Sequence, residues 1–350
     1  MNIILLYFLA FAGTVGFGIL TPLIPVYARE LGATGFMVGL LSSVFMISRA
    51  SSSFLSGNIL SSRNVSRAKS LRLLAPFMGI VPAMYSAFAL YWFMLILRAF
   101  QGAVNGMVWP SAQFLTLKNA DDKNKTRTIT LYYLLGNGGS ILSTLMLTVL
   151  IIAIERFSGL KGSAQYPLIF IITSMLMIPA VASVYFIKDD GRDEIKGKKH
   201  DEGGKSSVIS LYITAFIVGG ILTSSRSIVI LFLNEFVMQE LKNITIIYFI
   251  ANLASFPFIY MISSLVDKIG ERKIMPSIIV LSAAALFVLA FTRNLYVFII
   301  SLIVLFIGLK SFTPISRSVI KDKGKDLSKS IGHINGIQNA GSIAGPLIAG

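Results

Sequence analysis

Four basic side chains interrupt long apolar stretches of this sequence: Arg49, Arg98, Arg226 and Lys310. An ionised group at the centre of a bilayer costs roughly 3 kcal/mol on insertion scales, so it usually faces a cavity or a polar partner. The sixteen carboxylates, in contrast, lie in loops or at the ends of the apolar stretches. A passage lined by these cations would be electropositive, and it would favour anionic or neutral solutes.

A structural role competes with a pathway role for each of these cations. Arg98 can bond carbonyl groups of a neighbouring helix, and Arg49 precedes three serines that ease close helix packing. Arg226 lies near the end of its stretch, where its side chain can extend to the interface. Lys310 lies about 22 Å along its helix from the outer face, yet it can extend towards the opposite surface.

Amide and phenol groups supply further polarity within the apolar stretches. Gln101 and Asn105 share a helix face with Arg98, and Tyr133 and Asn137 share a face in the same way. Such faces suit hydrogen bonding to a small solute, although hydrogen bonds between helices use the same groups. The predicted pathway residues are Arg49, Arg98, Gln101, Asn105, Tyr133, Asn137, Arg226, Asn252 and Lys310.

Metal, cofactor and enzyme chemistry find no support in the sequence. The chain has no cysteine and two histidines, so cysteine–histidine metal sites and thiol catalysis are not expected. His333 lies at the start of an apolar stretch, where an interfacial position is the simpler interpretation. We therefore expect no metal, no cofactor and no enzymatic activity. An intramembrane enzyme and a non-transporting receptor are the weaker alternatives.

Eleven apolar segments position these residues. A helix needs about 20 mainly apolar residues to cross a bilayer, because its backbone groups find no other partners there. Hydrophobic residues make up 55% of the chain and charged residues 13%. We predict an all-α integral membrane protein, with spans at residues 2–28, 36–60, 71–90, 91–117, 129–154, 166–187, 208–233, 244–266, 274–292, 295–316 and 331–350.

The net charge of +15 is concentrated in alternate loops. When the N-terminus is placed in the cytoplasm, the even-numbered junctions hold most of the 31 Lys and Arg residues. This asymmetry predicts a multi-pass protein of the cell membrane with a cytoplasmic N-terminus. The basic excess is therefore topological, and nucleic acid is not an expected partner. The expected partners are the lipid bilayer, a small-molecule substrate and protons as a candidate coupling ion, and we expect a monomer.

The two halves of the chain resemble each other. The stretch from Asn137 is similar to that from Asn339, and Pro110 has a counterpart in Pro314, at offsets of roughly two hundred residues. Such duplication is typical of secondary transporters. We predict a six-helix bundle at residues 1–187, a cytoplasmic linker at 188–207 and a second bundle at 208–350, which lacks the last helix of a second six-helix repeat.

Two stretches of the sequence match family motifs: Leu265-Val-Asp-Lys-Ile-Gly-Glu-Arg-Lys273 and Arg98-Ala-Phe-Gln-Gly102. The first is similar to the loop signature of the major facilitator superfamily, and the second is similar to the signature of that family's fourth helix. Ser61 stands where the first-half loop signature has its aspartate. Two further stretches are similar to motifs of the drug:proton antiporter branch: Thr21-Pro-Leu-Ile-Pro-Val-Tyr27 and Gly341-Ser-Ile-Ala-Gly-Pro346.

The resemblance implies a secondary transporter that alternates access by rocking two helical bundles. It implies efflux of a drug or metabolite, with a sugar or organic-anion importer or an uncoupled facilitator as the alternative. The lack of an intramembrane carboxylate argues against proton exchange on a carboxylate.

Asp267 would latch one conformation by accepting bonds from Arg272 or from the first amides of a neighbouring helix. Ser61 cannot supply this charge in the first half, so the latch is expected on one side. The predicted latch and hinge residues are Pro22, Pro25, Gly57, Asp267, Gly270, Arg272, Gly341, Gly345 and Pro346.

Overall fold

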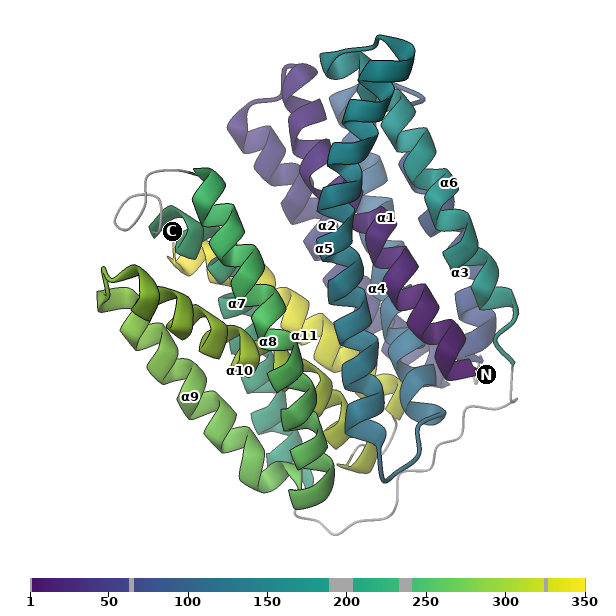
Figure 1. Ribbon diagram of the computed structural model, residues 1–350. Coiled ribbons are helices and arrows are strands. Elements are labelled where there is room, and N and C mark those ends of the chain that lie inside the picture. The colour runs from purple at the N-terminus through teal and green to yellow at the C-terminus, as the bar shows by residue number, and fades with distance from the viewer. Residues whose placement is uncertain (1, 63–65, 189–203, 233–240, 324–326, 350) are drawn as a thin grey trace. The chain divides into compact units, whose positions relative to one another are not determined.

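The computed structural model describes residues 2–62, 66–188, 204–232, 241–323 and 327–349 (Figure 1). These residues form eleven α-helices and one short 3-10 helix, Gly162–Gln165, with no β-strand among them. The α-helices are α1 (Asn2–Glu30), α2 (Gly35–Ser62), α3 (Arg67–Met84), α4 (Tyr91–Lys118), α5 (Lys125–Ser158), α6 (Tyr166–Tyr185), α7 (Gly204–Phe232), α8 (Leu241–Ile269), α9 (Glu271–Phe291), α10 (Leu295–Lys323) and α11 (Leu327–Ala349). The predicted all-α class is confirmed.

Most helices begin and end within a few residues of the predicted spans. Helix α3 differs, because it begins at Arg67 and ends at Met84, short of the predicted end at residue 90. The amides of Tyr85 and Ser86 donate to carbonyl groups three residues back, 3.2 and 3.0 Å away, which tightens the backbone beyond Met84. Helix α5 continues to Ser158 and ends before Gly159, whose φ of +71° suits a helix terminus.

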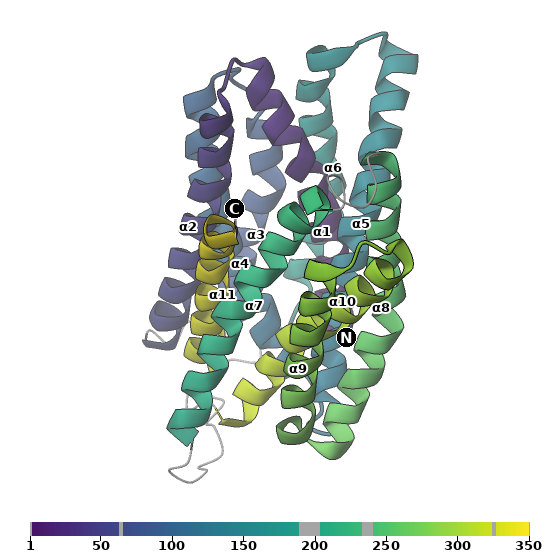
Figure 2. The same ribbon diagram turned by 90° about the vertical axis from the view of Figure 1, so that its left-hand side faces the viewer.

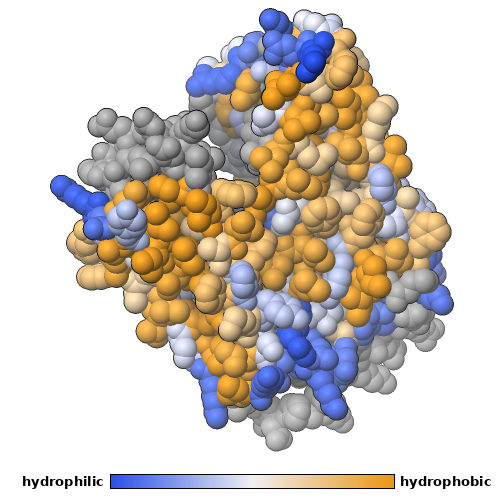
Figure 3. Space-filling model, in the orientation of Figure 1, coloured by the Kyte–Doolittle hydropathy of each residue, from blue (hydrophilic) through white to orange (hydrophobic). Residues whose placement is uncertain are grey.

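Seven helices in the described part of the chain are long and apolar enough to cross a membrane: α1, α2, α5, α6, α8, α9 and α10. Helix α7 adds a shorter apolar stretch, Ile209–Thr223. Helix α4 is more polar but is buried almost continuously from Gly102 to Leu117, so it needs less apolar surface than a helix that faces lipid. Figure 3 shows broad hydrophobic surface over the helices, as expected of a protein surrounded by acyl chains.

The described chain divides into two compact units. Unit 1 contains Met1–Asn119, Tyr132–Ile195 and Ser328–Gly336, and unit 2 contains Ala120–Leu131, Lys196–Leu327 and Ile337–Gly350. The first turns of α5 therefore belong to unit 2, and the first turns of α11 belong to unit 1. The domain scheme with boundaries at 187 and 208 stays a prediction, and residues 189–203 of the linker lie outside the described residues.

Close helix contacts hold unit 1 together. Helix α4 contacts α1, α2 and α3, and α6 contacts α1 and α3. A Cβ atom at Gly102 would overlap the carbonyl oxygen of Phe45, and one at Gly106 would overlap that of Arg49. Glycine at both positions therefore lets the α2 and α4 backbones approach each other. In unit 2, α10 contacts α7, α8 and α9 and forms the centre of the packing.

Candidate functional site

Arg98 lies in a buried polar cluster of unit 1, with 6% of its surface exposed. Its Nη1 atom donates to Oε1 of Gln101 at 3.1 Å, and the hydroxyl of Tyr85 donates to the same oxygen at 3.1 Å. The guanidinium also lies 5.3 Å from the centre of the Phe45 ring. Among the described residues, the bonded partner of this cation is thus a neutral amide, supplemented by a ring face.

The cluster continues along one face of α4. The side-chain amide of Asn105 donates to the Gln101 carbonyl at 2.8 Å, and Trp109 Nε1 donates to Asn105 Oδ1 at 2.7 Å. Gln101 and Asn105 also line a cavity of about 10 Å³ together with residues of α1, α3 and α6, which is space for about one water molecule. The predicted shared face of Arg98, Gln101 and Asn105 is therefore present and internally hydrogen-bonded.

Arg49 combines a packing contact with an electrostatic one. Its carbonyl oxygen accepts a hydrogen bond from Ser53 Oγ at 2.9 Å and lies against Gly106. Its charge interacts with the buried phenol of Tyr132 on α5. Tyr133 and Asn137, also on α5, are half-buried. A direct bond between Arg98 and Arg49 or α5 is not among the contacts of the described residues.

Lys310 and Asn252, both predicted as pathway residues, meet in unit 2. Lys310 Nζ on α10 donates to Oδ1 of Asn252 on α8 at 2.5 Å. The same nitrogen lies 5.4 Å from the ring centre of Phe256 and 5.0 Å from that of Phe306. The ammonium is thus held inside the unit by a neutral oxygen and two aromatic faces, as Arg98 is in unit 1.

Arg317 corrects the predicted end of span ten. The sequence places it in a loop after residue 316, whereas the structure places it inside α10 with 1% exposure. Its Nη1 atom donates to Ser316 Oγ at 2.8 Å, and its Nη2 atom donates to Gln338 Oε1 of α11 at 2.5 Å. Both Nη atoms of Arg317 thus donate to protein oxygens, whereas a loop position would leave them to bond water.

Arg67 corrects the second predicted junction in the same way. It lies in the first turn of α3 with 1% exposure, 3.4 Å from Ser111 Oγ and 5.5 Å from the centre of the Phe114 ring. The serine and threonine residues that surround Arg317 in the sequence are a signal that could have located it inside a helix. Arg67 has a weaker signal, because its partners lie on another helix.

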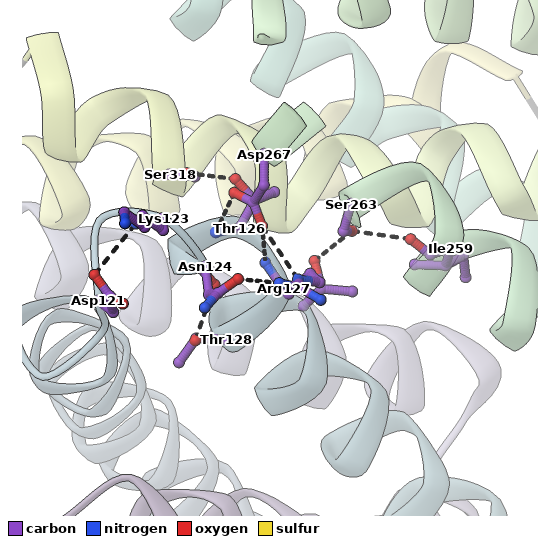
Figure 4. A network of polar contacts seen from close by, with 11 residues as sticks. Asp121, Lys123, Asn124, Thr126, Arg127, Thr128, Ile259, Ser263, Asp267 and Ser318 are labelled. Carbon is purple, nitrogen blue, oxygen red and sulfur yellow. Dashed lines mark hydrogen bonds and ion pairs between the residues drawn. The ribbon is translucent and has the colours of Figure 1, made fainter. Parts of the chain in front are cut away.

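Asp267 binds the start of α5 within unit 2 (Figure 4). Its two carboxylate oxygens accept hydrogen bonds from the backbone amides of Thr126 and Arg127, at 3.1 and 3.0 Å. These amides lie in the first turn of α5, where no carbonyl of the same helix is available to accept them. Because a helix N-terminus favours an anion, the geometry is that expected of the latch. The alternative donor Arg272 has a side chain outside the described residues.

Two pairs of hydroxyl groups also join the start of α5 to its neighbours, one pair to α10 and the other to α8. Thr126 Oγ1 lies 2.8 Å from Ser318 Oγ of α10, and Thr130 Oγ1 lies 2.6 Å from Ser263 Oγ of α8. Lys321 of α10 adds a hydrogen bond to the carbonyl oxygen of Ala120 at 3.1 Å. The segment Ala120–Leu131 is therefore fixed to both α8 and α10.

The predicted hinge residues occupy close contacts and one tight turn. Gly270 joins α8 to α9 with a φ of +93°, a conformation that glycine adopts without steric cost. The first turns of α11 lie beside α2 (Figure 2). A Cβ atom at Gly57 of α2 would lie 3.0 Å from the carbonyl oxygen of Lys329 in these turns, and Gly341 packs against Phe216 of α7. Pro25 is half-buried in α1. The side chains of Pro22, Arg226 and Pro346, and the surroundings of Gly345, lie outside the described residues.

The fold and these motifs define a class of membrane transporter. The family model described as Major Facilitator Superfamily matches residues 6–223 and 215–350, so the chain belongs to this superfamily. The resemblance inferred from the motifs is thereby confirmed, as is the superfamily's helical fold. The chain is a multi-pass membrane protein of a family of transporters rather than enzymes.

Relatives of this chain include two resistance proteins. It is 22% identical to the quinolone resistance protein NorA of Staphylococcus aureus (strain COL), over 100% of this chain and 89% of that protein. It is 26% identical to the multidrug resistance protein MdtG of Escherichia fergusonii, over 84% of this chain and 72% of that protein.

Solved structures share the fold at lower identity. The human organic anion transporter MFSD10 (TETRAN) has a TM-score of 0.75 at 12% identity and covers 99% of this chain and 92% of its own. The E. coli fucose:proton symporter FucP has a TM-score of 0.75 at 16% identity, with 99% and 90% covered. These structures support the fold alone.

Proposed function

We propose that this chain is a secondary transporter that exports small organic solutes by alternating access, and that these solutes are anionic or neutral. The observation that carries the substrate class is the pair of cations, Arg98 in unit 1 and Lys310 in unit 2. Each donates a hydrogen bond to a neutral amide oxygen and lies near an aromatic ring. An anionic or polar group of a solute can replace such an oxygen, whereas a cationic solute would be repelled.

The direction of transport is inferred from the relatives. NorA and MdtG are named for resistance to quinolones and to multiple drugs, and a transporter that confers resistance is expected to remove the drug from the cell. At 22% and 26% identity, these relatives support export as the direction of transport. They do not identify the solute.

The latch supplies the two-state element that alternating access requires. Asp267 stabilises a conformation in which the first turn of α5 lies against α8, and hydrogen bonds to a charged group contribute about 1.5–3 kcal/mol each. A cycle must break these bonds and form them again, so the contact biases the equilibrium between two conformations. Protons are the coupling ion that we propose, on the basis of the resemblance to antiporters.

Flux measurements in proteoliposomes test this proposal. Fluorescent or radiolabelled solutes that match in size and differ only in charge would be compared, with and without an imposed pH gradient. We expect saturable flux of anionic and neutral solutes that responds to the gradient. A preference for lipophilic cations would contradict the substrate class, flux insensitive to the gradient would reject proton coupling, and exclusively inward flux in oriented vesicles would support the importer alternative.

A further inference from the structure

Helices α3 and α6 of unit 1 form an apolar groove. The two helices lie side by side (Figure 1), and the groove between them has a volume of about 590 Å³. This volume falls within the range of about 300–1,000 Å³ that is typical of small-molecule sites. The groove is lined by Pro76, Gly79, Ile80, Ala83, Ile171, Ser174, Met175, Ile178, Val181, Ala182 and Tyr185.

Small residues create this groove. Gly79 and Ala83 of α3, together with Ser174 and Ala182 of α6, leave space between the larger side chains at its edges. The hydroxyl of Ser174 accepts a hydrogen bond from the backbone amide of Ala83 at 2.8 Å, so the one hydroxyl among these small residues is satisfied. The wall that remains is apolar and suits a hydrocarbon.

A cluster of basic groups lies at one end of the groove. The hydroxyl of Tyr185 donates to the Arg72 carbonyl at 3.2 Å, and Arg72 Nη2 donates to the Ile187 carbonyl at 2.5 Å. Lys188 follows Ile187 and is exposed, and Lys69, one turn before Arg72 on α3, is exposed as well.

Arg72 is half-buried and adds a third positive charge at this end. Asp189 and Asp190 come next in the sequence and lie outside the described residues. Two exposed ammonium groups beside a guanidinium suit a phosphate.

We propose that the groove binds an anionic glycerophospholipid, with one acyl chain between α3 and α6 and the phosphate at Lys69, Arg72 and Lys188. From Ile171 to Tyr185 the groove extends about 21 Å along α6, at 1.5 Å per residue. This exceeds the roughly 15 Å that one leaflet contributes to the hydrocarbon core, so a whole chain can lie along it. The basic end distinguishes an anionic lipid from a zwitterionic one or from a lipophilic solute.

Lipid titration of the purified full chain tests the headgroup contact. The melting temperature would be followed with phosphatidylglycerol and with phosphatidylcholine of the same acyl chains, since a ligand that binds the folded state raises it. Each basic side chain near a membrane surface is expected to contribute about fivefold in affinity. The double variant K69Q/K188Q should therefore bind phosphatidylglycerol about 30-fold more weakly and phosphatidylcholine as before. The matched variant K268Q/K273Q, which removes exposed lysines at α8 and α9, should bind both lipids like the original protein.

A second pair of variants tests the groove itself. Ala182 is exposed in the groove, and Ala284 is exposed on α9 outside it. Ala182→Trp should fill the groove and abolish the stabilisation by both lipids, whereas Ala284→Trp should leave it unchanged. Equal stabilisation of A182W and A284W would overturn the groove, and an undiminished preference of K69Q/K188Q for phosphatidylglycerol would overturn the phosphate position. The surface lysine variants keep the proposal falsifiable if A182W does not fold, and neither readout depends on which solute is transported.

Discussion

Replacement of Asp267 by asparagine removes the charge that binds the start of α5 while keeping the size of the side chain. In the original protein, both carboxylate oxygens accept backbone amides, at 3.1 and 3.0 Å, and the side chain is 4% exposed. Asparagine offers one neutral oxygen and one NH₂ group, so one of the two amides at Thr126 and Arg127 loses its acceptor.

The expected cost follows from these contacts. Two charge-assisted bonds of about 1.5–3 kcal/mol each are replaced by one neutral bond of about 1 kcal/mol, and the amide without an acceptor costs a further 1 kcal/mol or more. The latched arrangement should therefore lose at least about 3 kcal/mol relative to the unlatched one. Since about 1.4 kcal/mol is a factor of ten, the equilibrium should shift by at least about two powers of ten.

Two measurements report this shift. Hydrogen exchange should become at least about 100-fold faster at the amides of Thr126 and Arg127, because local opening is easier. Transport turnover in proteoliposomes should fall, while membrane insertion and the amount of purified protein stay unchanged. Glu155→Gln is the matched control, because Glu155 lies on the same helix and its ion pair with Lys161 is largely exposed.

The outcome that refutes the latch is specific. If D267N shows the same protection of both amides and the same turnover as E155Q, the two bonds contribute nothing to the conformational equilibrium. If exchange accelerates while turnover stays unchanged, the contact is structural and does not govern the transport cycle.

Three further predictions concern single side chains. Lys310→Met should reduce the flux of anionic solutes at least about tenfold and the flux of neutral solutes much less, because it removes the charge near the Phe306 ring. Equal losses of flux for both classes of solute would contradict this. Gly106→Ala should lower the free energy of unfolding by about 1–3 kcal/mol, because the new Cβ would overlap a carbonyl oxygen of α2. Gly138→Ala is the control and should not lower it, because a Cβ there meets no atom within 4 Å. Denaturant titration measures the free energy of unfolding of both variants. Gly270→Ala should cost about 1–3 kcal/mol, because φ of 93° and ψ of 152° are a combination that other residues rarely adopt. A melting temperature equal to that of the original protein would argue against strain at this turn.

The sequence predicts the helices well because hydrocarbon permits few other structures. An apolar stretch long enough to cross a bilayer must satisfy its backbone internally, so its length and composition specify a helix. The acceptor role of Asp267 could also be predicted, because a carboxylate at a helix end pairs best with helix N-terminal amides or with a cation.

Charge alone misplaces residues whose partners are distant in the sequence. Arg67 and Arg317 look like loop residues, yet both are buried inside helices, where they donate hydrogen bonds to Ser111 and Gln338. The pairing of Lys310 with Asn252 joins positions 58 residues apart, so neither residue indicates the other. The side chain of Arg226 lies outside the described residues, and its role stays a prediction.

The contact of Asp267 with the start of α5 also has a consequence for biosynthesis. The bonded residues are 141 and 140 positions apart, and a ribosome that adds about 5–20 residues per second reaches Asp267 about 7 to 28 s after Thr126. During that interval the first turn of α5 must be hydrated at the membrane surface without its later partner. The polar stretch Lys125-Thr-Arg-Thr128 is compatible with both situations, whereas an apolar start would tend to sink into the bilayer before α8 had been made.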